Sequence, residues 1–259
     1  MSLPAGTVPR PTYQLVRYPA GWWANPGRPS SIRVVDHARD GQAQQREQLI
    51  KYSLRMLDDG LALGTAGNLS VRDGDEVLIT PSGIAYRDLR PDDICVLATD
   101  GTALTGTGPP DAEPSSETPM HLAVYAATGA AAVVHTHSPE VIALSAVCDE
   151  LPAVHYAIVS LGGPVRVADY VRFGSEGLAQ AAQAALSGRT AAILRNHGAI
   201  SYGATLAEAY DRALLLEWLA RVHRLACSLG QPRILTQAEL DEVAAEMRRR
   251  RYGEARGHG

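Results

Sequence analysis

Two short apolar runs, far apart in the chain, each lead into histidine. Residues 131–134 precede His135 and His137, and residues 191–194 precede His197. Both runs have the composition of buried strands, and residues i and i+2 of a strand point to the same face. We therefore expect a sheet that carries the imidazoles of His135 and His137 on one face. The second run, also a strand, would bring His197 to the same point.

Three imidazoles that meet at one point are typical of a metal site. Three protein nitrogens with an open fourth position describe a catalytic zinc site, because structural zinc sites are closed by four protein ligands. A His-x-His pair alone is also compatible with two hydrogen-bonded core imidazoles, so the hypothesis depends on the third histidine. A cupin-type metal site is a further alternative, because Glu140 follows the pair. However, Ser138 and Pro139 have the pattern of a helix start, which predicts Glu140 in the first turn of a helix.

The chain is long enough to form one large domain. It has 259 residues, of which 46% are hydrophobic, and can bury a sizeable core. Residues 1–38 are rich in proline, glycine and arginine and carry Trp22 and Trp23 without a periodic pattern. We interpret this segment as an extension without a core of its own. Residues 39–259 are predicted to form a single catalytic domain.

Charge and composition argue against several classes of partner. The net charge is −4, and the run of arginines at 248–251 is predicted to be a solvated helix end, so no nucleic-acid surface is indicated. No apolar stretch approaches the roughly 18 residues of a membrane span, and the first residues lack the pattern of a signal peptide. Three widely spaced cysteines without a Cys-x-x-Cys motif are typical of reduced thiols. We expect a cytoplasmic protein that binds neither membranes nor nucleic acids.

Lys51 is the only lysine of the chain, and it lies in a stretch of helical periodicity whose polar face would carry it. Schiff-base aldolases, pyridoxal enzymes and P-loop proteins each need a lysine at a specific place. The composition therefore argues against lysine-based chemistry.

Helical periodicity and turn signals alternate along the rest of the chain. Helices are predicted over residues 42–59, 116–128 and 175–186, from Ser138 onward, and after capping boxes at Thr205 and Thr236; strands are predicted over 76–80 and 94–99, and a loop over 64–70. Short spacings between the early strands favour antiparallel pairs. The predicted fold is a three-layer mixed α/β sandwich, with a central, largely antiparallel sheet covered by helices on both faces.

Two hydroxyls and a carboxylate, from Ser115, Ser116 and Glu117, stand at the predicted start of the helix over 116–128, with Ser115 or Ser116 as its cap. Free N–H groups and the helix dipole make such a position favourable for an anion. By itself, however, the pattern is that of an ordinary helix cap. The loops at 65–68 and 80–83 are likewise ordinary turns when taken alone.

Taken together, these segments resemble one known family. The chain resembles the class II aldolases of the fuculose-phosphate aldolase and adducin-head superfamily over roughly residues 42–230. Seven motifs occur in the order of that family: Gly67-Asn68-Leu69-Ser70, Ile79-Thr80-Pro81-Ser82-Gly83, Pro114-Ser115-Ser116-Glu117, His135-Thr136-His137, Val154-His155-Tyr156, Phe173-Gly174 and Asn196-His197-Gly198. Each motif alone is weak, but seven in order are strong support for membership.

The resemblance implies a metal site and a base. In this family the three histidines that match His135, His137 and His197 hold a divalent ion, usually zinc, with manganese or cobalt as alternatives. The acid that matches Glu117 acts as the base and can also occupy a metal position. In a partly dry cleft, we expect the pKa of Glu117 to be raised toward neutral pH.

The resemblance also implies a substrate site and an assembly. A sugar phosphate would bind in a lysine-free pocket formed by Thr65, Asn68, Ser82, Gly83, Ser115 and Ser116. Family members are typically homotetramers with the site at a subunit interface, and Tyr156 of a neighbouring subunit would act as an acid toward the aldehyde oxygen. His155 precedes Tyr156 on a predicted strand and should therefore face away from it.

The expected function is zinc-dependent cleavage of a ketose 1-phosphate to dihydroxyacetone phosphate and an aldehyde, with the ion as Lewis acid in place of a lysine. Within the superfamily, the alternatives are a sugar-phosphate 4-epimerase, a dehydratase and a decarboxylase. The resemblance implies Ser-Ser-Asp in the epimerases where this chain has Ser115-Ser116-Glu117. The epimerases also add an acid near the site, and none is found over residues 154–161 of this chain. Both points favour an aldolase. A metal-free, adducin-like interaction module is the alternative from a different class. It should lack the histidine triad, which is complete here.

Overall fold

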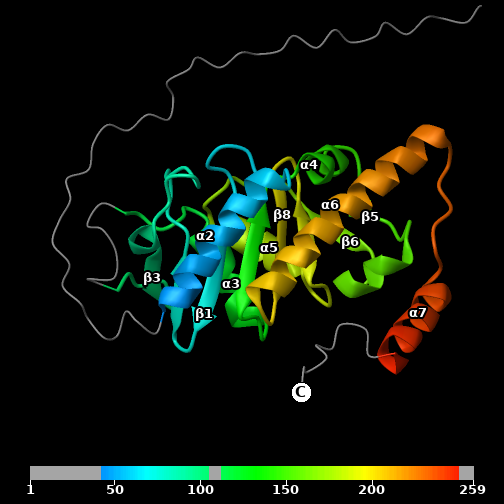
Figure 1. Ribbon diagram of the computed structural model, residues 1–259. Helices are drawn as coiled ribbons and strands as arrows, with labels where there is room; N and C mark the ends of the chain where they lie inside the picture. The colour runs from blue at the N-terminus through cyan, green and yellow to red at the C-terminus, as the bar shows by residue number, and fades with distance from the viewer. Residues whose placement is uncertain (1–41, 105–111, 251–259) are drawn as a thin grey trace, which may run out of the picture. The chain divides into compact units, whose positions relative to one another are not determined.

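The computed structural model of the protein describes residues 42–104 and 112–250 (Figure 1). The predicted extension, residues 1–38, lies outside these ranges, so a catalytic domain that begins at residue 39 stays a prediction. Among the described residues, no helix is both long and apolar enough to cross a membrane.

A single mixed sheet forms the centre of the described residues. Its strand order is β3 (Cys95–Ala98), β2 (Glu76–Ile79), β1 (Asn68–Asp73), β4 (Ala132–Thr136), β8 (Gly198–Gly203), β7 (Ala191–Leu194), β6 (Val165–Ala168) and β5 (Glu150–Leu151). Neighbouring strands are antiparallel, except for the parallel pair β6 and β7. The largely antiparallel sheet that the sequence predicts is therefore confirmed.

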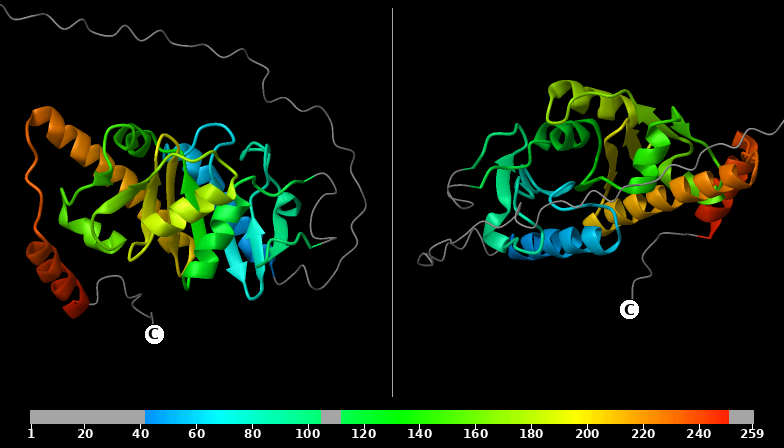
Figure 2. Two further views of the ribbon diagram at one scale, coloured as in Figure 1. Left: turned by 180° about the vertical axis from the view of Figure 1, so that it is seen from behind. Right: turned by 90° about the horizontal axis from the view of Figure 1, so that it is seen from above.

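Helices cover the sheet on both faces, as Figure 2 shows from above. The helices are α2 (Ala43–Asp58), α3 (Thr118–Ala127), α4 (Pro139–Ser145), α5 (Glu176–Ala185), α6 (Leu206–Leu229) and α7 (Gln237–Arg249), with short 3-10 helices η1 (Pro91–Asp93) and η2 (Tyr156–Leu161). Helices α2 and α6 lie on one face, and α3 and α5 pack together on the other. This arrangement is the predicted three-layer sandwich.

The side chains of β4 show why the run at 131–134 is apolar throughout. Ala132 and Val134 pack in the core beneath α2 and α6, whereas Val133 packs in the core beneath α3 and α5. A strand that is buried on both faces needs apolar residues at successive positions rather than at alternate ones. His135 and His137 continue the parity of Val133, which directs them to the face that carries α3 and α5.

The predicted helix starts are confirmed at several positions. Thr236 and Glu239 form a reciprocal capping box at α7, and the Thr205 hydroxyl accepts a hydrogen bond from the Glu208 N–H at α6. Helix α4 begins at Pro139, so Glu140 lies in its first turn as expected. Glu140 pairs there with Arg224 of α6 and not with the histidines.

Three local predictions were wrong. Residues 68–70 are not loop but the start of β1, where Asn68 and Ser70 are buried polar residues that bond to side chains of α3. Helix α3 begins later than predicted, with Glu117 rather than a serine at its N-cap. His155 and Tyr156 are not on a strand: His155 caps η2 by accepting the Ala157 N–H, and its ring centroid lies 4.4 Å from that of Tyr156. A strand's alternation therefore does not apply to this pair.

Gly198 allows β4 and β8 to approach closely beside the histidines. A Cβ atom at this position would lie 2.0 Å from the carbonyl oxygen of Thr136, so the strands would have to separate. We expect Gly198→Ala to lower the free energy of unfolding by about 1–3 kcal/mol, as overpacking does. Urea denaturation checks this, with Gly129→Ala as the control, because a Cβ at Gly129 meets no atom within 4 Å. Equal midpoints for the two variants would contradict the prediction.

Candidate metal centre and active site

His135 is held by the backbone of the neighbouring strand. Its Nδ1 lies 2.9 Å from the carbonyl oxygen of Ala199 in β8, and its side chain is completely buried. A carbonyl can only accept, so Nδ1 carries a hydrogen and Nε2 points its lone pair into the site in the neutral ring. Backbone contacts of this kind fix the tautomer of metal-binding histidines.

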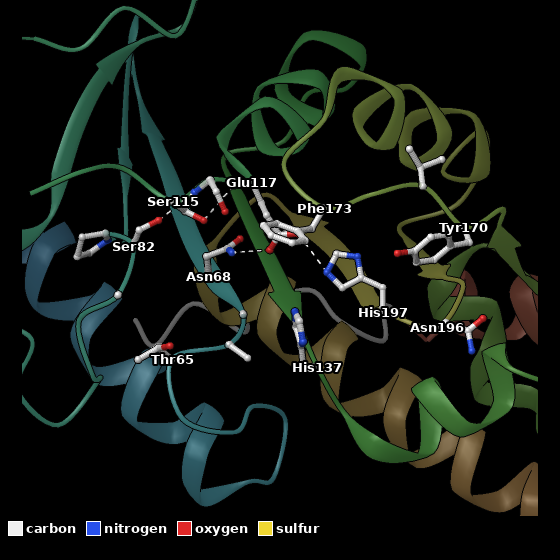
Figure 3. A pocket seen from close by; sticks show the side chains of 16 residues that line it. Thr65, Asn68, Ser82, Ser115, Glu117, His137, Tyr170, Phe173, Asn196 and His197 are labelled. Carbon is white, nitrogen blue, oxygen red and sulfur yellow. Dashed lines mark hydrogen bonds and ion pairs between the residues drawn. The ribbon is translucent and has the colours of Figure 1, made fainter. Parts of the chain in front are cut away.

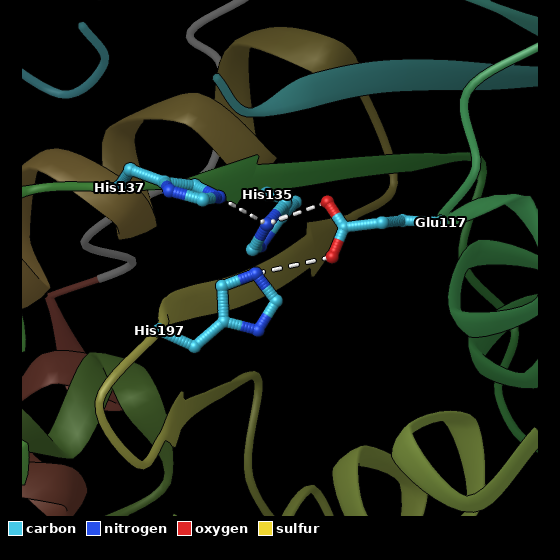
Figure 4. Close-up of side chains that lie close together, drawn as sticks. All are labelled: Glu117, His135, His137 and His197. Atoms are coloured by element: carbon cyan, nitrogen blue, oxygen red, sulfur yellow. Dashed lines mark hydrogen bonds and ion pairs between the residues drawn. The ribbon is translucent and has the colours of Figure 1, made fainter. Parts of the chain in front are cut away.

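Glu117 and the three histidines converge at one point, although they come from three separate segments (Figure 4). One ligand atom from each residue lies within 4.8 Å of all the others. His135 Nε2 is 3.0 Å from His137 Nε2 and 2.9 Å from Glu117 Oε2. The other carboxylate oxygen, Glu117 Oε1, is 3.1 Å from His197 Nε2. The structure thus brings together all four residues that the sequence singled out as metal ligands.

The donor set of this cluster fits a divalent cation. Glu117 Oε1 is buried and lacks a partner with hydrogen-bond geometry. Lone pairs of His135 and Glu117 face each other in a dry site, which is unfavourable unless a proton or a cation lies between them. Around a tetrahedral zinc ion with bonds of about 2.0–2.1 Å, ligand atoms are spaced by roughly 3.3 Å. The three contacts given above, of 2.9, 3.0 and 3.1 Å, are close to that spacing, and the whole set lies within 4.8 Å. Imidazole nitrogens with one carboxylate oxygen suit zinc and similar ions.

The pKa of Glu117 shifts in the direction opposite to the one expected from burial. Burial raises it, but the electrostatic attraction of His135 and the hydrogen bonds from His135, His197 and Asn68 outweigh burial and hold the pKa of Glu117 well below its usual range. The expectation of a raised pKa was wrong, because it considered the dry cleft without the groups that bond to the carboxylate. Glu117 is therefore ionised at neutral pH.

Two buried imidazoles of this region are neutral at physiological pH. Burial lowers the pKa of His121 and of His137 to about 3 in each case. Neutral imidazole is the form that binds metals, so His137 needs no deprotonation at neutral pH.

Burial of neutral His121 predicts a pH-dependent stability of the metal-free protein. In the unfolded chain His121 has a pKa of about 6.5, so it becomes protonated below that pH. In the folded protein its pKa is about 3, so it stays neutral between these two values. Stability should therefore fall as the pH drops, by up to about 1.4 kcal/mol per pH unit for this residue. Urea denaturation between pH 6 and 5 tests this, with His121→Gln as the comparison. A slope that is equally steep in the variant would contradict the prediction.

A pocket of about 360 Å³ opens beside the four residues. All six residues predicted to bind phosphate line it: Thr65, Asn68, Ser82, Gly83, Ser115 and Ser116. We call these six residues the phosphate cradle. Figure 3 shows Thr65, Ser82 and Ser115 on one side of Glu117 and His197. Lys51, by contrast, is exposed on α2 and does not line the pocket.

Hydrogen bonds join the parts of the cradle. The Ser116 N–H donates to Ser82 Oγ over 3.1 Å, and the Ser82 N–H donates to the carbonyl oxygen of Glu113 over 2.8 Å. The Tyr86 hydroxyl donates to the carbonyl oxygen of Gly67 over 2.6 Å. Three loops that are distant in the sequence are thus held as one rim.

The sequence did not assign a role to the opposite wall of the pocket. Tyr170, Val171 and Phe173, between β6 and α5, line it together with Asn196. Tyr170 and Phe173 are 64% and 60% exposed, which leaves them accessible to a ligand. The motif Phe173-Gly174 was a signal for part of this wall, but nothing in the pattern of this loop places Tyr170 there.

Tyr156 is the predicted site residue that the structure does not bring to the pocket of its own chain. It begins η2, is 53% exposed and is absent from the pocket lining. A role in catalysis therefore requires a second subunit, and it stays a prediction.

The fold and the site together define a class of protein. A solved L-fuculose 1-phosphate aldolase superposes with a TM-score of 0.74 and is 34% identical, covering 78% of this chain and 95% of its own. Residues 47–224 match the family described as the class II aldolase and adducin N-terminal domain, and the chain belongs to this family.

Two further relatives are similar over most of their length. A 5-deoxy-D-ribulose 1-phosphate aldolase of Bacillus thuringiensis serovar kurstaki is 36% identical, over 78% of this chain and 94% of the relative. A 5-methylthioribulose-1-phosphate/5-deoxyribulose-1-phosphate aldolase of Rhodospirillum rubrum is 40% identical, over 76% of this chain and 88% of the relative.

Proposed function

We propose that the protein is a metal-dependent class II aldolase that reversibly cleaves a ketose 1-phosphate to dihydroxyacetone phosphate and an aldehyde. The observation that carries this proposal is the convergence of Glu117 and three imidazoles beside a lysine-free cradle of hydroxyls and backbone. The relatives named as aldolases of ketose 1-phosphates support it.

His135, His137 and His197 would hold the ion, with Glu117 as a fourth ligand; zinc is the metal that we propose, with manganese or cobalt as substitutes. When bound, the metal supplies a Lewis acid that stabilises negative charge on substrate oxygen. The chain itself has no lysine at the pocket to do this through a Schiff base.

Glu117 is the proposed base. In the direction of synthesis, its carboxylate takes a proton from the carbon next to the carbonyl of dihydroxyacetone phosphate. The electron pair of that C–H bond forms the new carbon–carbon bond, and the aldehyde oxygen receives a proton from Tyr156 of a neighbouring subunit. Because the interactions of Glu117 lower its pKa, proton transfer to it requires that some of them loosen when the substrate binds. We propose a homotetramer in which subunits share sites; Tyr156 is exposed on its own chain and is therefore available to a neighbouring subunit.

The substrate phosphate is proposed to bind in the phosphate cradle. Ser115 and Ser116 stand just before the N-terminus of α3, where backbone N–H groups and the helix dipole favour an anion. The hydroxyls of Ser82 and Thr65 face the same space. The apolar wall of Tyr170, Val171 and Phe173 favours an aldehyde with an apolar end, as in the substrates named for the two relatives.

Product identification tests the function directly. We would mix the zinc-loaded protein with ketose 1-phosphates, including 5-deoxyribulose, 5-methylthioribulose and fuculose 1-phosphates, and follow phosphorus and proton NMR. The expected result is dihydroxyacetone phosphate with the matching aldehyde. An epimer, a dehydrated ketone or released carbon dioxide would instead assign another reaction to the same site. Absence of turnover by the metal-loaded protein with every member would contradict the proposed activity.

A further inference from the structure

A chain of buried hydrogen bonds leads from Glu117 into the core between β1 and α3. Asn68 Nδ2 donates to Glu117 Oε2 over 2.9 Å, and Asn68 Oδ1 is 2.6 Å from His121 Nε2. On the far side of the imidazole, His121 Nδ1 is 2.7 Å from Ser70 Oγ, which is 2.7 Å from the Tyr125 hydroxyl. All five side chains are buried, and His121 and Ser70 are completely inaccessible.

The spacing of these residues follows from the geometry of the two elements. Glu117 at the N-cap of α3 and His121 and Tyr125 within the helix recur every four residues. Asn68 and Ser70 are two residues apart on β1. Four residues of a helix rise about 6 Å and two residues of a strand rise about 6.6 Å, so the two rows stay in register. The helix and the strand therefore present a matched ladder of polar groups inside an otherwise apolar layer.

The carboxylate of Glu117 at one end fixes the donor and acceptor of every hydrogen bond in this chain. A carboxylate only accepts, so Asn68 must turn its NH₂ group to Glu117 and its oxygen to His121. That oxygen needs a donor, which requires the hydrogen of the neutral His121 ring on Nε2. His121 Nδ1 then accepts from the Ser70 hydroxyl, and Ser70 accepts from Tyr125. Every donor points toward Glu117, and aligned bonds of this kind strengthen one another.

We propose that His121 is a positioning residue of the active site, which acts through Asn68 to orient the carboxylate of Glu117. Without the Nε2–H of His121, the Asn68 oxygen loses its donor. The amide can then turn over and direct its oxygen at the carboxylate, which repels it. The side chain of Asn68 thus has a role beyond the phosphate cradle, where only its second N–H remains to be offered to an anion. The part of this inference that concerns turnover rests on the proposed aldolase function.

The tautomer of His121 is the first test, and it needs neither metal nor substrate. Nitrogen NMR of the metal-free protein labelled with ¹⁵N-histidine resolves the two ring nitrogens, and the resonances that vanish in His121→Gln assign the residue. The expected result is hydrogen on Nε2 and a bare Nδ1. Hydrogen on Nδ1 would reverse the chain and overturn the proposal.

Two variants then separate positioning from packing. His121→Leu fills the space without a donor, and we expect it to lower kcat and zinc affinity by about 10–100-fold, the range for residues behind metal ligands, while KM changes little. His121→Gln retains an N–H for Asn68 and should recover most of both losses. Tyr125→Phe removes only the far end of the chain and serves as the control for a buried polar deletion, with a smaller effect than His121→Leu.

Thermal unfolding would establish that the variants are folded before they are compared. Equal losses in His121→Leu and His121→Gln, or no loss in His121→Leu, would show that His121 contributes only packing. If the wild-type protein cleaves none of the ketose phosphates, the proposed aldolase function fails. The tautomer and the zinc dissociation constants still decide the role of His121 in that case.

Discussion

His135→Ala is expected to weaken zinc binding by more than about 100-fold and to abolish measurable aldol cleavage, a larger effect than that of losing a group behind the ligands. His135 occupies the centre of the cluster, because its Nε2 lies within 3.0 Å of both His137 Nε2 and Glu117 Oε2. Its removal leaves two imidazoles and a carboxylate around a cavity. Isothermal titration with zinc, together with metal analysis of the purified protein, measures the first effect, and the NMR product assay measures the second.

The control for His135→Ala is His223→Ala. His223 lies on α6, and it is not part of the cluster of Glu117 and the three histidines. It should leave zinc content and turnover unchanged. Normal zinc content and rate in His135→Ala itself would remove the metal centre from the proposal.

Glu117→Gln is expected to retain zinc on three imidazoles but to lose proton transfer at the substrate carbon by about 10²–10⁴-fold, the usual contribution of a positioned acid or base. Glutamine has nearly the same shape and one oxygen that can accept from Asn68, so the surroundings should persist. Exchange of the carbon-bound proton of dihydroxyacetone phosphate in deuterated water measures this step without an aldehyde. It is therefore independent of Tyr156.

Glu140→Gln provides the matched control for this substitution. Glu140 is also near the histidines in sequence, but it pairs with Arg224 on α6 and does not line the pocket. The control should exchange at the wild-type rate. If Glu117→Gln also exchanged at that rate, a different group would have to be the base.

The cluster of Glu117 and three histidines, our candidate metal centre, shows how much local sequence patterns can predict. Apolar runs at 131–134 and 191–194 predicted strands, and the parity of His135 and His137 predicted a common face; both predictions are confirmed in β4 and β7. They succeeded because alternation along a strand is a property of the backbone, which depends little on the rest of the fold. Helix caps at Thr205 and Thr236 succeeded for the same reason, since a cap is satisfied within four residues.

The failures concern groups whose behaviour depends on distant partners. The start of β1 has turn-like composition, and only its contacts with α3 explain why Asn68 and Ser70 lie inside a sheet. The pKa of Glu117 was expected to be raised because a partly dry cleft was assumed, whereas the groups that bond to the carboxylate and lower its pKa come from distant parts of the sequence. Similarly, no local signal brings Tyr170 to the wall opposite the phosphate cradle.

The sequence by itself therefore determined the class of fold, the strands and helices that carry the candidate site, and the identity of the four residues that converge there. Only the tertiary structure decided that Glu117 is ionised, that Asn68 of β1 bonds to its carboxylate and that His121 stands behind Asn68. The physical reason is the distance along the sequence over which each effect acts. Strand parity and helix capping act over a few residues, whereas the pKa of a buried carboxylate and the direction of a hydrogen-bond chain depend on donors about fifty residues away in sequence, as between Asn68 and Glu117.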